Sequence, residues 1–142
     1  MKAKDIMTQD VATIRGSATV AEAVRLMRLK EIRALIVEAR GEEDAYGIVT
    51  ETDVVAKVVA YGKDPKQVRV YEIMSKPCIV VNPDLSLEYV SRLFANTGVW
   101  RAPVIQGDLL GIISVTDILN KGDFLENPKL AYLQQKLQEA IS

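Results

Sequence analysis

The sequence predicts an α/β (α+β) fold made of two β-α-β-β-α repeats followed by one C-terminal helix. Two observations carry this prediction. Residues 5–27 recur at residues 72–94 with a constant offset of 67, and GIVTETD at 47–53 recurs as GIISVTD at 111–117 with an offset of 64. One repeat alone is close to the size at which a single hydrophobic core becomes marginal. We therefore expect the two repeats to share a core.

The first repeat is expected over residues 1–60. Its predicted elements are, in order, a strand at 11–14, a helix beginning near residue 20, strands at 34–37 and 46–49, and a helix at 52–60. The first helix is predicted because apolar residues recur at helical spacing from Val20 to Met27. Gly62 lies just beyond the second helix and is expected to end it.

The second repeat is expected over residues 71–122, after a connection at 61–70 that holds Gly and Pro among charged residues. Its predicted elements are a strand at 79–81, a helix at 87–95, strands at 102–105 and 109–113, and a helix from about residue 116. Gly107 and Asp108 form the tight hairpin turn. The first repeat has a longer charged loop at the corresponding place.

Residues 127–142 lie beyond the repeats and predict an amphipathic helix. Asn127 is a candidate N-cap, with Pro128 at the first helical position. An apolar stripe follows helical spacing and consists of Leu130, Leu133, Leu137 and Ile141. This stripe can pack on its own subunit, on a second copy of the chain or on a partner, and the sequence leaves these alternatives open.

Composition indicates an ordinary globular domain, with 49% hydrophobic and 26% charged residues in 142. No apolar stretch is long enough to span a membrane, and the first ten residues lack the apolar core of a signal peptide. A cytoplasmic location is therefore expected, without a membrane partner. The net charge of −1 and the scattered basic residues predict no nucleic-acid partner. Arg15, Arg25 and Lys57 are expected on solvated faces.

The chain contains no histidine and a single cysteine, Cys78. Histidine is the usual general base and the commonest metal ligand. Its absence argues against an enzyme, a catalytic residue or a metal site, and no cofactor is expected. Cys78 lies in the apolar run CIVV and is expected at a buried strand position.

A hydroxyl residue and an aspartate, three positions apart, lie where a strand ends and a helix begins in each repeat. The pairs are Thr50 with Asp53 and Ser114 with Asp117. Backbone N–H groups at such a junction favour an anion such as phosphate, and an aspartate one turn along can accept hydrogen bonds from ribose hydroxyls. The same spacing is also a capping box that only begins a helix. Spacing alone leaves both interpretations open.

With these motifs, the chain resembles a tandem pair of cystathionine-β-synthase (CBS) domains. The resemblance covers residues 1 to about 122 and is carried by DIM and EIM at the start of each copy, the helices SATVAEAVRLM and DLSLEYVSRLF, the strands RALIV and RAPVI, and the paired G-h-h-[ST]-x-x-D endings, where h is an apolar residue. It implies a non-catalytic regulatory module with pseudo-twofold symmetry. Such a module binds an adenine compound in clefts between the repeats and signals to a regulated partner protein, which the sequence does not identify.

The resemblance also implies roles for individual residues. Asp53 and Asp117 are expected to bind ribose hydroxyls, and four residues to approach the phosphates: Thr50, Ser114, Arg33 and Arg101. The adenine walls are expected to be formed by Ile48, Ile112, Ala34, Ala102, Ala18 and Leu85. The expected ligands are AMP, ADP or ATP, with NAD or S-adenosylmethionine as further candidates. Family members commonly form homodimers through their helices, and we expect a homodimer here.

Two differences between the repeats predict unequal clefts. Leu85 is larger than Ala18 at the matching position, and Trp100 precedes Arg101. Trp100 can stack on a base or pack beside a buried strand, and both interpretations stay open. An alternative function is a structural module for dimerisation or docking, with empty clefts and a C-terminal helix that binds the partner.

Overall fold

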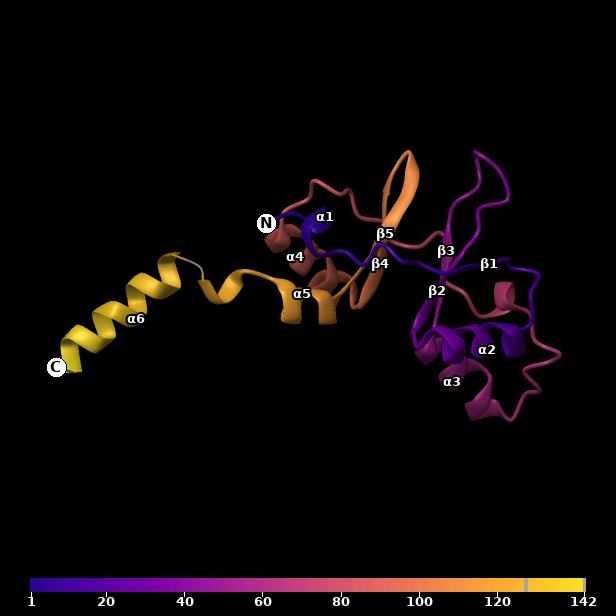
Figure 1. Ribbon diagram of the computed structural model, residues 1–142. Helices are drawn as coiled ribbons and strands as arrows, with labels where there is room; N and C mark the ends of the chain where they lie inside the picture. Colours follow the sequence, from indigo (N-terminus) through magenta and orange to yellow (C-terminus); the bar gives the residue numbers. More distant parts are fainter. Residues whose placement is uncertain (127, 142) are drawn as a thin grey trace.

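The computed structural model describes residues 1–126 and 128–141, which form two α/β repeats and a separate C-terminal helix (Figure 1). The elements are α1 (Ala3–Ile6), β1 (Thr13–Ile14), α2 (Val20–Lys30), β2 (Ala34–Val37), β3 (Gly47–Thr50), α3 (Glu51–Lys57), α4 (Leu87–Thr97), β4 (Arg101–Gln106), β5 (Asp108–Ser114), α5 (Val115–Lys121) and α6 (Pro128–Ile141). Short 3₁₀ helices lie at Val59–Tyr61, Val70–Glu72 and Phe124–Glu126. The predicted mixture of helices and strands is confirmed.

The two sheets differ in size. In the first repeat β1 is parallel to β2, and β2 is antiparallel to β3. In the second repeat β4 and β5 form an antiparallel pair. The strand predicted at 79–81 is wrong in length, since only Val81 bridges to Val104. Two hydrogen bonds hold Val81 there, from its N–H to Pro103 O (2.9 Å) and from the N–H of Ile105 to its carbonyl (3.0 Å).

The helix predicted at 52–60 also ends earlier than expected. α3 stops at Lys57, and a 3₁₀ turn continues to Tyr61. Gly62 then adopts a left-handed conformation (φ 63°), and its N–H donates to Val59 O at 3.1 Å. Gly62 therefore ends the 3₁₀ turn rather than the α-helix itself, as a residue without Cβ does at low cost.

Each repeat has its own hydrophobic cluster, and a third cluster joins them. In β2, Leu35 and Val37 pack in the first repeat's cluster. Ala34 and Ile36, on the opposite face of β2, belong to a cluster that also includes Ile112 of β5. Alternate side chains of a strand point to opposite faces, so β2 is buried on both sides. The repeats share a core, as expected.

The opening segment of each repeat packs against the other repeat. The N–H of Ala3 donates to Leu85 O (2.9 Å), and the N–H of Thr8 donates to Ile112 O (2.8 Å). Residues 70–75 pack on the first repeat instead, where the N–H of Ser75 donates to Ile48 O (2.9 Å). The chain therefore passes between the repeats at residues 9–12 and 76–79, which we call the crossing segments. Figure 1 shows the first of them running from α1 past β5 to β1.

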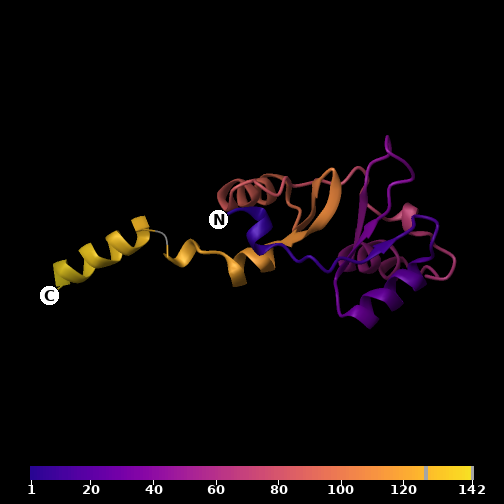
Figure 2. The ribbon, with the colours of Figure 1, turned by 45° about the horizontal axis from the view of Figure 1, so that its top comes forward.

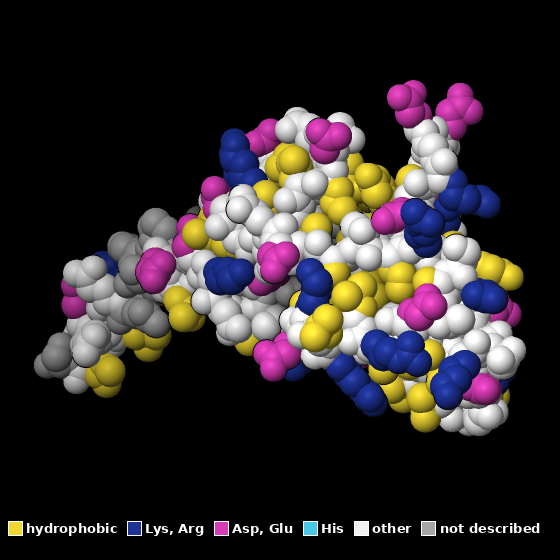
Figure 3. Space-filling view, turned by 45° about the vertical axis from the view of Figure 1, so that its right-hand side comes forward, with side chains coloured by type: hydrophobic (Ala, Val, Ile, Leu, Met, Phe, Trp, Pro, Cys, Tyr) yellow, Lys and Arg dark blue, Asp and Glu magenta, His cyan; other side chains and the backbone are white. Residues whose placement is uncertain are grey.

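Two parts of the chain project from this body. The loop between β2 and β3 extends outward with acidic side chains at its tip (Figure 3). α6 extends away from both repeats in two views (Figures 1 and 2), and Leu133, Leu137 and Ile141 are exposed. These three side chains do not pack on their own subunit. The predicted cap at Asn127 and the side chain of Leu130 lie outside the described residues. No helix among the described residues is long and apolar enough to cross a membrane.

Candidate functional site

Two clefts open between the repeats, one beside each crossing segment. The Asp117 cleft has a volume of about 260 Å³ and the Asp53 cleft about 510 Å³. The Asp117 cleft is lined by Thr8, 10–12, 31–34, Ile36, Arg101, Ile112, Ser114, Thr116 and Asp117. The Asp53 cleft is lined by Ile48, Thr50, Thr52, Asp53, Ser75, 77–79 and 98–101. Each cleft thus combines a crossing segment, the residues after a helix, and a junction between a strand and a helix.

The two linings are related by the offsets found in the sequence. Thr8 corresponds to Ser75 and the segment 31–34 to 98–101, both with the offset of 67. Asp53 corresponds to Asp117 with the offset of 64. The structure therefore places one hydroxyl and aspartate pair in each cleft, and the clefts are pseudo-symmetric.

The junction between β5 and α5 has the geometry of a capping box. Oδ2 of Asp117 accepts hydrogen bonds from the N–H (3.0 Å) and the hydroxyl (3.1 Å) of Ser114, whose oxygen accepts from the N–H of Asp117 (3.1 Å). Thr50 and Asp53 make the same three bonds, at 2.9, 3.1 and 3.3 Å. The helix-cap interpretation is therefore correct in both repeats. Both hydroxyl protons are directed at the aspartates, so neither hydroxyl donates into its cleft in this arrangement.

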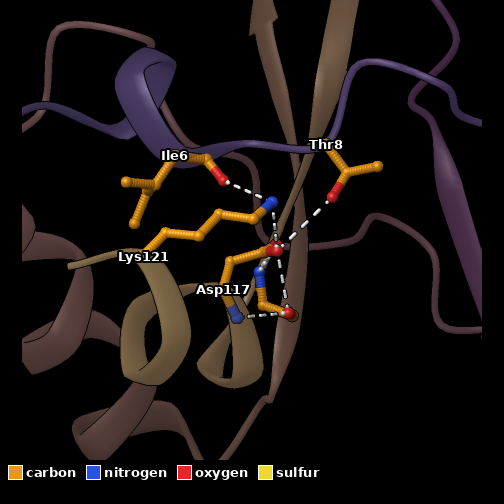
Figure 4. Close-up of polar contacts among 5 residues, drawn as sticks. Ile6, Thr8, Asp117 and Lys121 are labelled. Carbon is orange, nitrogen blue, oxygen red and sulfur yellow. Dashed lines mark hydrogen bonds and ion pairs between the residues drawn. The ribbon is translucent and has the colours of Figure 1, made fainter.

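The other oxygen of each aspartate is held by a lysine one helical turn along. Lys121 Nζ lies 3.1 Å from Asp117 Oδ1 and 3.4 Å from the carbonyl of Ile6, so it links α5 to α1 (Figure 4). Lys57 Nζ lies 3.0 Å from Asp53 Oδ1 and donates to Ile73 O at 2.8 Å. Lys57 is exposed, as expected, but it also makes these two contacts. The offset of 64 between the lysines was the signal that sequence reasoning missed.

The two aspartates differ in one contact, a hydrogen bond from the hydroxyl of Thr8, which lies just before the first crossing segment. Thr8 Oγ1 donates to Asp117 Oδ1 at 3.4 Å (Figure 4). Ser75, the counterpart of Thr8, lines the Asp53 cleft but has no such bond to Asp53 among the described residues. Both hydroxyls follow the methionine of DIM or EIM directly, a position that sequence reasoning passed over.

The strand register corrects the predicted equivalence of Arg33 and Arg101. Ala34 pairs with Thr50, whereas Arg101 pairs with Ser114, so Arg101 is the structural counterpart of Ala34. The carbonyls of Arg33 and Trp100 both accept from the first residue of the following helix, at 2.9 Å. Trp100 is therefore the counterpart of Arg33. Similar letters in RALIV and RAPVI suggested an offset of 68, but the repeat keeps its offset of 67 through these strands.

This register distributes the arginines unequally. Arg33 lines the Asp117 cleft, and Trp100 lines the Asp53 cleft with its side chain exposed. Arg101 lines both clefts. Only 14% of its side chain is exposed, and its guanidinium lies 3.9 Å from Glu51.

The predicted adenine walls are placed only in part. Ile112 and Ala34 line the Asp117 cleft, and Ile48 lines the Asp53 cleft. Three other predicted wall residues line neither cleft: Ala102, Ala18 and Leu85. Ala102 is fully buried in the second repeat's core, because the register turns it away from the cleft. Ala18 and Leu85 pack against the two core clusters. The crossing segments form the cleft walls that were assigned to Ala18 and Leu85.

Cys78 lies on the second crossing segment and lines the Asp53 cleft, so it is not in a core strand. Its side chain is partly buried, and desolvation raises the pKa of the thiol above its ordinary value. Among the described residues no three His, Cys, Asp or Glu side chains are grouped so that they could hold a metal ion.

Comparison with known proteins agrees with this geometry. The family model of the CBS domain matches residues 3–60 and 70–122. The CBS domain-containing protein YhcV of Bacillus subtilis is 35% identical over 116 residues, which are 81% of both chains. The chain belongs to the CBS domain family and carries two CBS repeats. Proteins of this kind are generally non-catalytic regulatory modules.

Other relatives extend beyond the matched region. The uncharacterized protein MK0525 of Methanopyrus kandleri is 32% identical over 123 residues, and the chain spans 62% of its length. The inosine-5'-monophosphate dehydrogenase of Methanocaldococcus jannaschii is 30% identical over 122 residues, but these are only 23% of that enzyme. The match to the enzyme is therefore limited to one region of it.

Solved structures confirm the tandem CBS fold. A hexameric CBS-CP12 protein from bloom-forming cyanobacteria is 64% identical, with a TM-score of 0.89, and the match covers 99% of this chain and 82% of that one. Hypoxic response protein I, solved with two coordinated zinc ions, is 29% identical, with a TM-score of 0.70 over 85% of this chain and 98% of that one.

Proposed function

We propose that the chain is a non-catalytic regulatory module that binds adenine nucleotides in the Asp117 and Asp53 clefts and signals to a partner protein. One observation carries the proposal. Each cleft presents an aspartate and at least one arginine on walls that both repeats supply. An aspartate accepts hydrogen bonds from two ribose hydroxyls, and arginine binds phosphate through a planar fork of donors.

The linings support a mononucleotide with a flat apolar base. Ile112 and Ala34 in one cleft, and Ile48 and Trp100 in the other, offer apolar contact beside the charged groups. The volume of about 260 Å³ lies just below the usual range of ligand sites, and that of about 510 Å³ lies in its lower half. AMP, ADP and ATP are therefore preferred to the larger NAD, and S-adenosylmethionine lacks the phosphates that the arginines suit.

A thermal-shift panel tests this proposal. AMP, ADP, ATP, NAD and S-adenosylmethionine are added separately to the full chain. A ligand present at about 100 times its dissociation constant stabilises the native state by roughly 2.7 kcal/mol. At least one adenine nucleotide should raise the Tm, and GMP serves as the matched control for the base. No shift with any adenine compound would contradict the proposal.

Self-association is the second part of the proposal. Apolar side chains are exposed on helices of both repeats and on α6: Leu29, Val55, Val59, Tyr89, Leu119, Leu133, Leu137 and Ile141. The hexamer named for the 64% identical relative supports an assembly of several copies, with the expected homodimer as its unit. The CP12 part named for that relative supports a protein partner.

The alternative function is a docking module with empty clefts, and the exposed face of α6 supports it. Removal of α6 distinguishes this alternative from nucleotide binding. Light scattering of the full chain and of residues 1–126 compares their masses. If residues 1–126 form a smaller assembly than the full chain and bind nucleotide equally well, then α6 mediates assembly and the clefts mediate binding. Assembly with no nucleotide binding under any condition would favour the docking module.

A further inference from the structure

We propose that Arg101 couples the two clefts, so that a phosphate bound in one weakens phosphate binding in the other. The inference rests on the proposed nucleotide binding and deepens it. Its basis is the place of one side chain. Arg101 lines both the Asp117 cleft and the Asp53 cleft, whereas Arg33 and Trp100 each line only one.

The surroundings of Arg101 limit the positive charge that it can offer to a phosphate in either cleft. Its side chain is 14% exposed, so water screens it little, and Glu51 at 3.9 Å already offsets part of its charge. In the Asp53 cleft, Arg101 is the only Lys or Arg among the lining residues. The Asp117 cleft also has Arg33. A phosphate in the Asp117 cleft therefore binds Arg101, the same cation that a phosphate in the Asp53 cleft needs.

The sign of the coupling follows from charge. A first phosphate engages the donors of Arg101 and adds negative charge beside Glu51. A second phosphate then meets a neutralised guanidinium and a like charge across it, which disfavours binding. Thermodynamic linkage requires the effect to be equal in both directions. A ligand without phosphate should not produce it.

Trp100 provides a signal from one cleft alone. It is the only tryptophan of the chain, it lines the Asp53 cleft, and 64% of it is exposed. In an AMP titration its fluorescence follows the Asp53 cleft, while calorimetry follows both clefts. Asp117→Ala is used to empty the other cleft, and circular dichroism melting verifies that each variant folds.

With AMP, we expect Asp117→Ala to lower the midpoint of the Trp100 signal by about tenfold, a typical size for coupling between sites. Asp53→Ala should tighten the Asp117 cleft in calorimetry only to the extent that the Asp53 cleft fills first in wild type, because the two midpoint shifts together amount to one coupling factor. In an Arg101→Gln background Asp117→Ala should produce no shift, whereas in an Arg25→Gln background, at an exposed arginine that lines neither cleft, the shift should remain. Adenosine, which has no phosphate, should give equal midpoints in wild type and Asp117→Ala.

Each outcome decides between the two proposals. Two independent AMP sites, or a midpoint that rises in Asp117→Ala, would overturn the coupling and leave nucleotide binding intact. No calorimetric signal with AMP, ADP or ATP would instead remove the proposed function. If AMP leaves Trp100 fluorescence unchanged, the stepwise constants from calorimetry decide. The product of the two stepwise association constants in wild type must then be smaller than the product of the association constants measured in the two aspartate variants.

Discussion

The ammonium group of Lys121 lies 3.1 Å from Oδ1 of Asp117, one turn along α5, and it also reaches the carbonyl of Ile6. Lys57 repeats the arrangement with Asp53 at 3.0 Å. In both clefts the lysine fixes the carboxylate and connects it to the opening segment of a repeat. The aspartates are therefore oriented by contacts from two directions, the capping box and the lysine.

Lys121→Met should weaken nucleotide binding in the Asp117 cleft by about threefold to fivefold, roughly 0.5–1 kcal/mol, as expected for a partly exposed ion pair. The reason is a less well oriented carboxylate, with the fold retained. Calorimetry of Lys121→Met in an Asp53→Ala background measures it. Lys57→Met is the matched control and should leave this cleft unchanged. Tighter binding in Lys121→Met would mean that the lysine competes with the ribose.

Gly111→Ala should destabilise the fold because the opening segment lies directly over the glycine. An added Cβ would be 2.7 Å from the carbonyl of Thr8 and 2.9 Å from Sδ of Met7. Such overpacking costs about 1–3 kcal/mol. Urea unfolding measures the change, and Gly41→Ala is the control, since nothing lies within 4 Å of a Cβ there. Equal stability of the two variants would show that the segment moves freely.

The thiol of Cys78 should react slowly with iodoacetamide near neutral pH, because desolvation raises its pKa and leaves little thiolate. Cys78 lines the Asp53 cleft. AMP should therefore slow the reaction further by several-fold in wild type and not in Asp53→Ala. Mass spectrometry follows the rate. Protection that persists in Asp53→Ala would place the nucleotide elsewhere.

Acid should loosen the loop between β2 and β3 through Asp44. Lys76 at 2.6 Å and the backbone N–H of Arg40 at 2.8 Å hold the pKa of this carboxyl well below its ordinary value. A carboxyl whose pKa is lower in the folded state stabilises that state above its unfolded pKa of about 4. This stabilisation is lost as the pH falls below that value.

Asp44→Asn should therefore show a smaller loss of stability between pH 7 and pH 3 than wild type. Urea midpoints at each pH measure the difference. Glu43→Gln changes an exposed acid on the same loop and should keep the wild-type pH dependence. Identical pH dependence in Asp44→Asn and wild type would contradict the assigned role of the Lys76 contact.

The duplication predicted the order of elements and the placement of Asp53 and Asp117 in separate clefts, because it preserves spacing along the chain. The matching motifs RALIV and RAPVI suggest that Arg101 is the counterpart of Arg33, but its structural counterpart is Ala34. Similar residues at an offset of 68 obscured the register, which is set by hydrogen bonds between strands. Lys57 and Lys121 were within reach of sequence reasoning, since they share the offset of 64.

The sequence does not predict that the opening segment of each repeat packs against the other repeat. Ala3 and Val70 are both buried, but which repeat buries each one depends on contacts between distant residues. No local periodicity encodes that choice. For the same reason Ala18 and Leu85 were expected in cleft walls that the crossing segments supply, whereas Ala102 was misplaced by the strand register.

The proposed function depends on the two aspartates, which bind the ribose of an adenine nucleotide. Calorimetric titration of AMP into wild type and into the Asp53→Ala, Asp117→Ala double variant tests it most directly. Each aspartate should contribute roughly 1.5–3 kcal/mol, the worth of a hydrogen bond to a charged group. Saturable binding in wild type with heat lost in the folded double variant is the predicted result. Unchanged affinity in the double variant would contradict it.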